Sequence, residues 1–173
     1  MKIRLLSPVL SLLLASALLG ACSPKYNWRD YASPDAPYKI MFPAKPASVT
    51  RTIDLDGMQV SMTMTAAEVD GTTFAVGSAE APDEAHARAA LPAMRLALLR
   101  NIGAGDSPAQ AAAGPDGKAV SEIDTTGNTK GGPVRLVGHF EARGKRFYQV
   151  IVLGKANAVP PEQIEQFLTS FKL

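Results

Sequence analysis

One stretch of alternating polarity, bounded by two Asp-Gly pairs, limits the fold more than any other part of the sequence. From Met58 to Val69 the residues at 58, 60, 62, 64 and 66 are apolar, and most of those between them are polar. This period of two is typical of a β-strand with one buried face. Asp56-Gly57 and Asp70-Gly71 favour tight hairpin turns on either side. The sequence therefore predicts three consecutive antiparallel strands over 49–55, 58–69 and 72–79.

Shorter signals extend this pattern to most of the chain. A brief edge strand is expected over 38–42, because Pro43 and Pro46 follow it, and Gly77 within the third strand suggests a bulge. The segment 104–117, rich in Ala, Gly and Pro, is expected to be a mobile loop. A second group of three strands is expected at 118–125, 134–142 and 146–153, with a flexible loop over 127–133.

Two amphipathic helices are predicted, one after each group of strands. The first begins at Pro82-Asp83-Glu84, where the helix dipole favours carboxylates, and it ends within 101–105. Pro92 is expected to kink it. Its apolar stripe is expected to face the sheet, and its arginines to point elsewhere: Arg88, Arg95 and Arg100. The second helix starts at Pro160-Pro161 and carries an apolar stripe of Ile164, Phe167, Leu168 and Phe171.

Together these elements predict an α+β fold. Hairpin connections make the sheet mostly antiparallel, with six to seven strands in two meanders, and the two helices must bury their stripes on it. Residues 38–173 are expected to form a single domain, preceded by a polar tether over 22–37. That tether is expected to end by docking its aromatic residues, with Trp28 covering an edge of the core.

Several of these segments resemble small bacterial PsbP-like domains. The resemblance rests on 38–43 with Lys45-Pro46, on the hairpin at 67–76, on 143–152 and on the closing run 167–171. It implies an α/β/α sandwich around an antiparallel sheet, used for docking onto protein complexes, and it carries over no catalytic residue.

The N-terminus has the features of an export signal. Lys2 and Arg4 precede an apolar run over 9–19 that is too short to span a membrane. Leu19-Gly20-Ala21-Cys22 resembles a bacterial lipobox, which implies cleavage of residues 1–21 and lipidation of Cys22, the only cysteine. Lipidation also removes a free thiol that could form intermolecular disulfides in an oxidising compartment.

This resemblance predicts a protein anchored to the membrane by the lipid on Cys22. Ser23 is not the aspartate that usually retains lipoproteins on the inner membrane, so the outer membrane, facing the periplasm, is expected. The signal contains two of the 18 Lys and Arg residues, so the mature chain balances its 16 Asp and Glu. This balance, together with export, argues against a nucleic-acid partner.

No catalytic or metal-binding constellation emerges from the sequence. His86 is expected in the first turn of a helix and His139 on a partly exposed strand face, neither with an obvious partner. Three methionines share one face of a predicted strand: Met58, Met62 and Met64. Thioether sulfurs can bind copper, but methionines on one strand face are more often part of a packed core. We therefore expect neither an enzyme nor a cofactor.

One local basic cluster lies at a predicted hairpin tip, at Arg143, Lys145 and Arg146, and Lys130 and Arg135 are candidates to join it. It is either a solvated turn or a contact patch for an anionic headgroup, a peptidoglycan carboxylate or an acidic partner. The sequence thus favours a docking or assembly module that binds an envelope protein through a sheet edge or this hairpin. The alternative is a module that binds a small apolar or lipidic ligand between a helix and the sheet.

Overall fold

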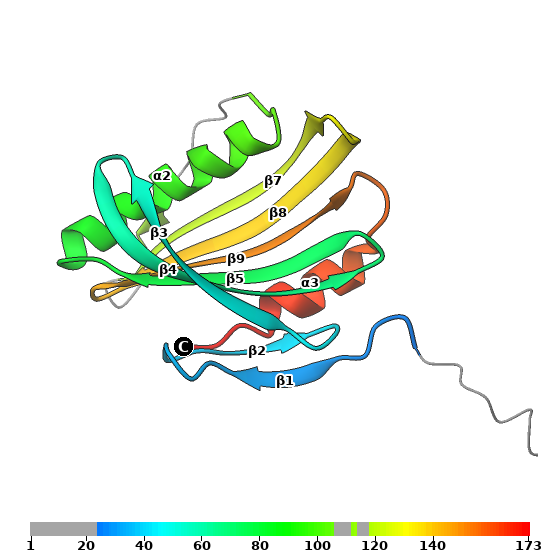
Figure 1. The fold of residues 1–173 in the computed structure, drawn as a ribbon, viewed down its shortest axis with the longest axis horizontal. Coiled ribbons are helices and arrows are strands. Elements are labelled where there is room, and N and C mark those ends of the chain that lie inside the picture. The colour runs from blue at the N-terminus through cyan, green and yellow to red at the C-terminus, as the bar shows by residue number, and fades with distance from the viewer. Residues whose placement is uncertain (1–23, 106–111, 114–117) are drawn as a thin grey trace, which may run out of the picture.

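The computed structural model describes residues 24–105, 112–113 and 118–173, which fold around one seven-stranded antiparallel sheet (Figure 1). The strand order is β3-β4-β5-β9-β8-β7-β6, so the two groups of consecutive strands meet where β5 pairs with β9. The predicted α+β fold with a mostly antiparallel sheet is confirmed. The strands are β3 (Ala47–Leu55), β4 (Met58–Val69), β5 (Thr72–Glu80), β6 (Ala112–Ala113), β7 (Ala119–Thr129), β8 (Gly132–Arg143) and β9 (Arg146–Lys155).

Both predicted Asp-Gly hairpins are present. Asp56 and Gly57 have φ angles of 54° and 87°, and Asp70 and Gly71 have φ angles of 48° and 72°. Two successive positive φ angles give a type I′ turn, whose twist matches that of the strands it joins. β3 and β4 therefore pair without interruption from Ala47↔Ala66 to Leu55↔Met58.

The expected flexible loop over 127–133 is wrong. β7 continues to Thr129 and pairs there with Gly132, so that only Lys130 and Gly131 form the turn. Gly127 is needed within the strand, because a Cβ atom there would overlap the carbonyl oxygen of Ile102. The glycine allows the close approach of another backbone segment and does not mark a loop.

The expected bulge at Gly77 is also wrong. Gly77 pairs in regular register with Met64 on one side and Gln149 on the other. A Cβ atom at Gly77 would lie 2.7 Å from Cγ of Gln149 and 2.7 Å from Sδ of Met64. Glycine is required here because neighbouring side chains cross the strand, not because the strand bends.

Helix α2 (Glu84–Asn101) covers one face of the sheet. Its N-cap is Asp83, whose side chain accepts a hydrogen bond of 2.9 Å from the backbone N–H of His86. The helix packs mainly on β7, β8 and β9, where Leu91, Met94 and Leu99 join Phe140 and Phe147 in a buried cluster. Pro92 lies on the exposed side and the helix continues through it.

Arg95 corrects the expectation that the three arginines of α2 point away from the core. Its side chain is buried, whereas Arg88 and Arg100 are exposed. A long side chain can bury its methylene groups along an apolar surface, so helical spacing alone does not assign an arginine to the solvent.

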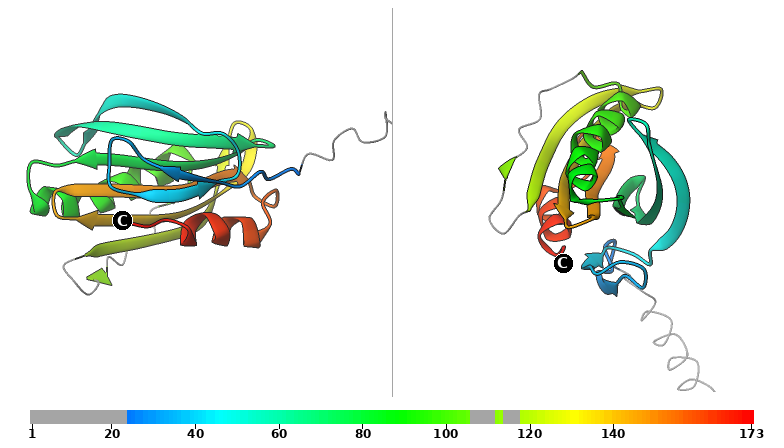
Figure 2. Two further views of the ribbon diagram at one scale, coloured as in Figure 1. Left: turned by 90° about the horizontal axis from the view of Figure 1, so that it is seen from below. Right: turned by 90° about the vertical axis from the view of Figure 1, so that its left-hand side faces the viewer.

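The opposite face of the sheet is covered by α3 (Pro161–Thr169) and by a separate hairpin of β1 (Arg29–Ala32) and β2 (Lys39–Phe42) (Figure 2). The ring of Phe167 lies 5.4 Å from that of Phe42 and 5.3 Å from that of Phe74. The C-terminal segment is joined to the hairpin by two backbone hydrogen bonds between Lys39 and Lys172. Ends of the chain distant in sequence thus form one layer.

This arrangement corrects the boundary expected at residue 38. Residues 29–32 form β1 and pair with β2 in continuous register, so the folded domain includes much of the segment expected to be a tether. Tyr26, Trp28 and Tyr31 pack against the core on this face, and indole Nε1 of Trp28 donates a 3.1 Å hydrogen bond to Oε1 of Gln163. The expectation that Trp28 covers an edge of the core is confirmed.

The expected mobile loop over 104–117 lies mostly outside the described residues, at 106–111 and 114–117. Within it, β6 (Ala112–Ala113) pairs with Ala119 and Val120 of β7, a short strand that was not predicted.

Candidate functional site

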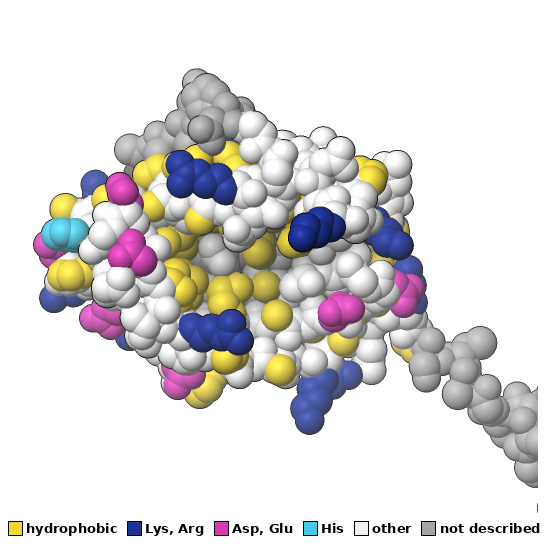
Figure 3. All heavy atoms as spheres, turned by 45° about the horizontal axis from the view of Figure 1, so that its top comes forward, with side chains coloured by type: hydrophobic (Ala, Val, Ile, Leu, Met, Phe, Trp, Pro, Cys, Tyr) yellow, Lys and Arg dark blue, Asp and Glu magenta, His cyan; other side chains and the backbone are white. Residues whose placement is uncertain are grey.

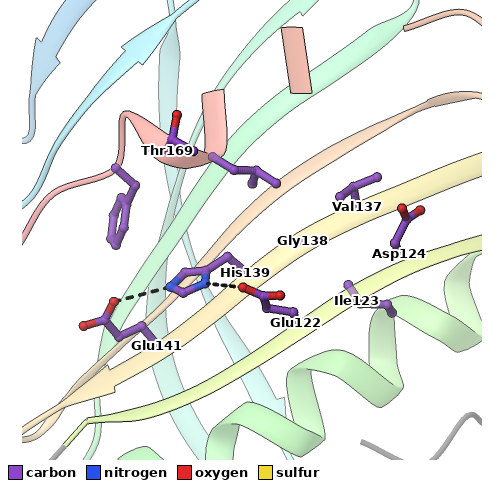
Figure 4. A pocket seen from close by; sticks show the side chains of 10 residues that line it. Glu122, Ile123, Asp124, Val137, Gly138, His139, Glu141 and Thr169 are labelled. Atoms are coloured by element: carbon purple, nitrogen blue, oxygen red, sulfur yellow. Dashed lines mark hydrogen bonds and ion pairs between the residues drawn. The ribbon is translucent and has the colours of Figure 1, made fainter. Parts of the chain in front are cut away.

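An open groove lies on the α3 side of the sheet, where α3 does not cover β7 and β8 (Figure 4). Its volume is about 620 Å³. One wall consists of Glu122 and Asp124 on β7 with Val137, His139 and Glu141 on β8. The other wall is formed by the end of α3 and the residues after it: Leu168, Thr169 and Phe171. The groove is therefore polar on the sheet and mostly apolar on the helix side.

His139 is held between two carboxylates in this groove. Its Nε2 lies 3.3 Å from Oε2 of Glu141 and its Nδ1 lies 3.9 Å from Oε1 of Glu122, as Figure 4 shows. Glu141 is buried and its other oxygen lies 3.6 Å from Nζ of Lys118. His139 is also next to the ring of Phe171, 6.4 Å away.

Other charges in the groove are paired as well. Arg135 donates two hydrogen bonds to Asp124, of 2.9 Å from Nε and 2.7 Å from Nη2. The hydrogen bonds from Arg135 hold the pKa of the Asp124 carboxyl below its ordinary value. The polar side chains on the sheet side of the groove thus pair within β8 and between β7 and β8, an arrangement typical of a solvated sheet face.

The groove offers His139 no nucleophile to activate among the described residues. The Thr169 hydroxyl donates to the carbonyl oxygen of Glu165 at 2.7 Å, and the Ser170 hydroxyl donates to that of Phe167 at 2.8 Å. Nucleophilic catalysis needs a hydroxyl or thiol within hydrogen-bond reach of the base. This geometry is better suited to contact with a ligand or partner than to covalent chemistry.

The carboxylate partners of His139 were missed from the sequence. Glu122 lies directly across from His139 in the β7–β8 register. That register is determined by the two-residue turn at Lys130-Gly131. A loop expected over 127–133 gives no such register, so the residue opposite His139 could not be assigned from the sequence. His86, the other histidine, is exposed and its Nδ1 lies 2.8 Å from Oδ1 of Asp83 at the helix N-cap.

The structure divides the basic residues expected to form one patch. Arg143 and Lys145 are exposed at the β8–β9 turn, but Nη2 of Arg146 lies 2.9 Å from Oε2 of Glu80. Lys130 and Arg135 belong to the opposite end of β8, so they do not join the cluster. Of the expected patch at this turn, Arg143 and Lys145 are the two that form no ion pair with any described residue.

The three methionines take part in packing. Met62 is buried, Met58 and Met64 are partly buried against the same core, and Sδ of Met64 accepts a 3.3 Å hydrogen bond from Nε2 of Gln149. Across residues 24–105, 112–113 and 118–173, no group of three or more His, Cys, Asp or Glu side chains is placed to hold a metal ion.

The outer edge of β3 is an open edge of the sheet. In the part of the chain that the structure describes, β3 pairs only with β4. Eight of its nine residues are exposed or half-buried, from Ala47 to Asp54, and only Leu55 is buried. Because Leu55 and Met58 flank a two-residue type I′ turn, they exchange both hydrogen bonds, and alternate residues of β3 face outward. The outward N–H and C=O groups are those of Ser48, Thr50, Thr52 and Asp54.

The side chains of β3 differ between its two faces. On the α3 side, the hydroxyls of Ser48 and Thr50 pair with those of Thr65 and Thr63, each at 2.8 Å. On the α2 side, Val49 is 49% exposed, followed by Arg51 and the half-buried Ile53. Arg51 forms no ion pair with any other described residue.

Comparison of the sequence with protein-family models finds no match, and comparison with curated proteins finds no significant match. Cys22 lies outside the described residues. No helix within the described part of the chain is long and apolar enough to cross a membrane.

Proposed function

We propose that this chain is a non-catalytic cell-envelope lipoprotein whose domain docks an extended segment of a protein partner onto β3. The observation that carries the proposal is the open edge of β3, with four residues whose backbone groups face outward. A peptide added as a further strand satisfies these groups by main-chain hydrogen bonds and gains specificity from alternate side chains.

The side chains of β3 define the chemistry of the partner segment. On the α2 side the row Val49, Arg51, Ile53 places an unpaired cation between two apolar residues. A complementary strand carries an Asp or Glu opposite Arg51 and an apolar residue two positions away on each side. On the other face, Thr50 and Thr52 favour small polar residues.

A second copy of this chain fits the edge less well. Two copies can pair through their β3 edges when they are related by a twofold axis perpendicular to the sheet. Residues opposite each other in antiparallel strands have their side chains on the same face, so the axis must pass beside one residue, which then lies opposite its own copy. Pairing about Arg51 places two arginines opposite each other, which is unfavourable, and pairing about Thr52 places Arg51 opposite Ile53. Neither arrangement supplies the carboxylate that Arg51 lacks.

The envelope location is proposed from the lipobox resemblance. Leu19-Gly20-Ala21-Cys22 supports cleavage before Cys22 and lipidation of its sulfur, and Ser23 supports the outer membrane, facing the periplasm. We also propose a PsbP-like relationship. The layer order of α2, sheet and α3, with its two meanders, supports it, because that resemblance implies helices on both faces of an antiparallel sheet.

One observation favours the alternative, a module for an apolar ligand. Figure 3 shows a hollow in the surface with hydrophobic side chains at its floor. The partly buried apolar residues that pack against the core on the α2 side include Ile53, Met58, Met64 and Ala66 on β3 and β4, and Ala93 on α2. A neighbouring groove of about 370 Å³ lies between the β3–β4 turn and α2.

Proline substitutions in β3 separate docking from folding. Thr50→Pro removes an N–H that faces the open edge, so the domain should fold and docking should be lost. The matched Arg51→Pro removes an N–H bonded to β4 and should lower the melting temperature. A third variant, Arg51→Glu, should fold and lose a partner that carries the expected carboxylate.

The readout is photo-crosslinking in whole envelopes from a probe at Thr52, with a probe at Glu68 as the control away from the edge. We expect one stoichiometric adduct from position 52, abolished by Thr50→Pro and by Arg51→Glu. An adduct that persists in folded Thr50→Pro protein contradicts strand addition. If no adduct forms from 52 but a fluorescent fatty acid binds the purified protein, the apolar-ligand alternative replaces docking.

A further inference from the structure

We infer that the domain stands on the membrane in one orientation, with the β4–β5 and β7–β8 turns against the bilayer and the β8–β9 turn pointing away. We call these the anchor end and the distal end. The inference rests on the lipidation of Cys22 in the proposed function. It assigns Lys130 and Lys155 to contact with anionic lipid headgroups.

The chain is attached to the domain from Lys25 onward. Nζ of Lys25 lies 2.9 Å from Oδ2 of Asp70 in the β4–β5 turn. This exposed ion pair is weak by itself, but the next residues reinforce it. The rings of Tyr26 and Trp28 pack edge-on against Phe74 at 6.4 Å and 6.1 Å, and the N–H of Asn27 donates to the carbonyl oxygen of Pro43 at 2.8 Å.

Chain length then limits how far the domain can move from its lipid. Cys22 and Lys25 are separated by three peptide units, which span at most about 11 Å when fully extended. Lys25 therefore stays within roughly that distance of Cys22, and the β4–β5 turn is joined to Lys25 by the Asp70 ion pair. A domain held so closely cannot stand inverted, because inversion would move Lys25 away from the bilayer by the length of β9, about 30 Å.

Strand pairing defines the two ends. Thr73 pairs with Leu153 near the β4–β5 turn, and Glu80 pairs with Arg146 at the other end of the same two strands. At about 3.3 Å per residue, β9 separates the ends by roughly 30 Å. Figure 1 shows the chain entering beside the anchor end, with the β8–β9 turn on the far side.

Exposed lysines lie at the anchor end together with the exposed carboxylates Glu68 and Asp70, so the orientation rests on the attachment of the chain at Lys25, Tyr26 and Trp28 and not on net charge. Lys130 and Lys155 are exposed at the anchor end and form no ion pair with any described residue. Such lysines are attracted to an anionic bilayer surface within a Debye length. The distal end also carries exposed carboxylates, of which Asp83 pairs with His86 and Glu84 with Arg88, whereas Asp56 is in no ion pair with a described residue. Arg143 and Lys145 also lie there, which excludes them from headgroup contact with the anchoring membrane.

Lipidation makes a site-specific test possible, because it occupies the only natural thiol. Asn157→Cys, in the exposed loop at the anchor end, and Lys145→Cys, at the distal end, each introduce one free cysteine for a fluorophore. The labelled lipoproteins are reconstituted in vesicles of phosphatidylcholine and phosphatidylglycerol that contain nitroxide-headgroup lipid. We expect several-fold stronger quenching at 157 than at 145. Equal or reversed quenching overturns the orientation.

Two charge-reversal variants test whether the anchor-end lysines contribute to the orientation. Lys130→Glu with Lys155→Glu should weaken quenching at 157, whereas Arg143→Glu with Lys145→Glu, the matched distal pair, should not. An unchanged signal in the anchor-end pair overturns the role of these lysines. Metabolic palmitate labelling is checked first. If Cys22 takes no lipid, the anchor itself fails, whereas labelled protein with equal quenching contradicts the orientation alone.

Discussion

At the scale of single residues, backbone contact explains the importance of one glycine. Gly127 lies under the end of α2, where a Cβ atom would overlap the carbonyl oxygen of Ile102. Gly127→Ala should therefore destabilise the domain by about 1 to 3 kcal/mol or more, since a backbone group cannot turn aside as a side chain can. Urea denaturation measures the loss. Gly105→Ala, where an added Cβ atom would have no described residue other than its chain neighbours within 4 Å, should be near neutral. Equal stability of the two variants would refute the close approach.

Phe167 is the residue that most directly joins α3 to the sheet. Its side chain is fully buried between Phe42 and Phe74. Phe167→Ala should lower the free energy of unfolding by about 3 to 5 kcal/mol, a large part of the stability of a domain this size. The exposed control Val49→Ala should change it little. A melting temperature close to that of the wild type would show that α3 is not part of the cooperative core.

The Asp124–Arg135 pair predicts a small pH dependence of stability. The hydrogen bond from Arg135 lowers the pKa of Asp124 below 3.8, so the pair stabilises the fold above that pH and ceases to do so as pH falls through the lowered pKa. The side chains of Arg135 and Asp124 are 34% and 55% exposed. Solvent screening therefore keeps the contribution of this ion pair to the free energy of unfolding below about 1 kcal/mol. Denaturation of wild type and Asp124→Asn at pH 7 and in acid checks this. A difference that grows toward acid pH contradicts the pair.

At the scale of elements, local signals predicted the parts of the fold that local chemistry determines. The alternation of 58–69 and its flanking Asp-Gly pairs led to the correct strands, because turn type and strand face depend on neighbouring residues alone. Gly77 and Gly127 were misread because a glycine that allows a close contact looks, in sequence, like one that bends the chain. The carboxylates beside His139 needed a register that only the complete hairpin supplies.

The N-terminal hairpin shows a second limit. β1 is short and its residues are mostly exposed, so it has little pattern of its own and is held by the layer it joins. Tyr26→Ala with Trp28→Ala should therefore lower the free energy of unfolding by about 2 to 4 kcal/mol. Asp30→Ala, on the exposed strand, is the control. If the double variant unfolds at the same urea concentration as wild type, the segment is a tether after all.

At the scale of the whole molecule, we propose a sheet with an open edge at β3 and a membrane anchor at one end. The long axis of the sheet runs away from the proposed bilayer, so β3 extends from near the membrane toward the distal end and remains accessible along its length. A partner can pair with β3 if it presents, near the membrane, an extended segment with an Asp or Glu at its centre. The His139 groove lies on β7 and β8, away from this edge, whereas the groove beside α2 reaches Asp54 and Leu55 of β3.

Amide hydrogen exchange of the docked complex tests the central claim most directly. The amides of Thr50 and Thr52 face the open edge and should exchange rapidly in the free protein. In the complex with the partner crosslinked from position 52, they should become strongly protected, while the exposed turn amides of Gly144 and Lys145 stay unchanged. Rapid exchange of Thr50 and Thr52 in the stoichiometric complex would contradict strand addition at β3.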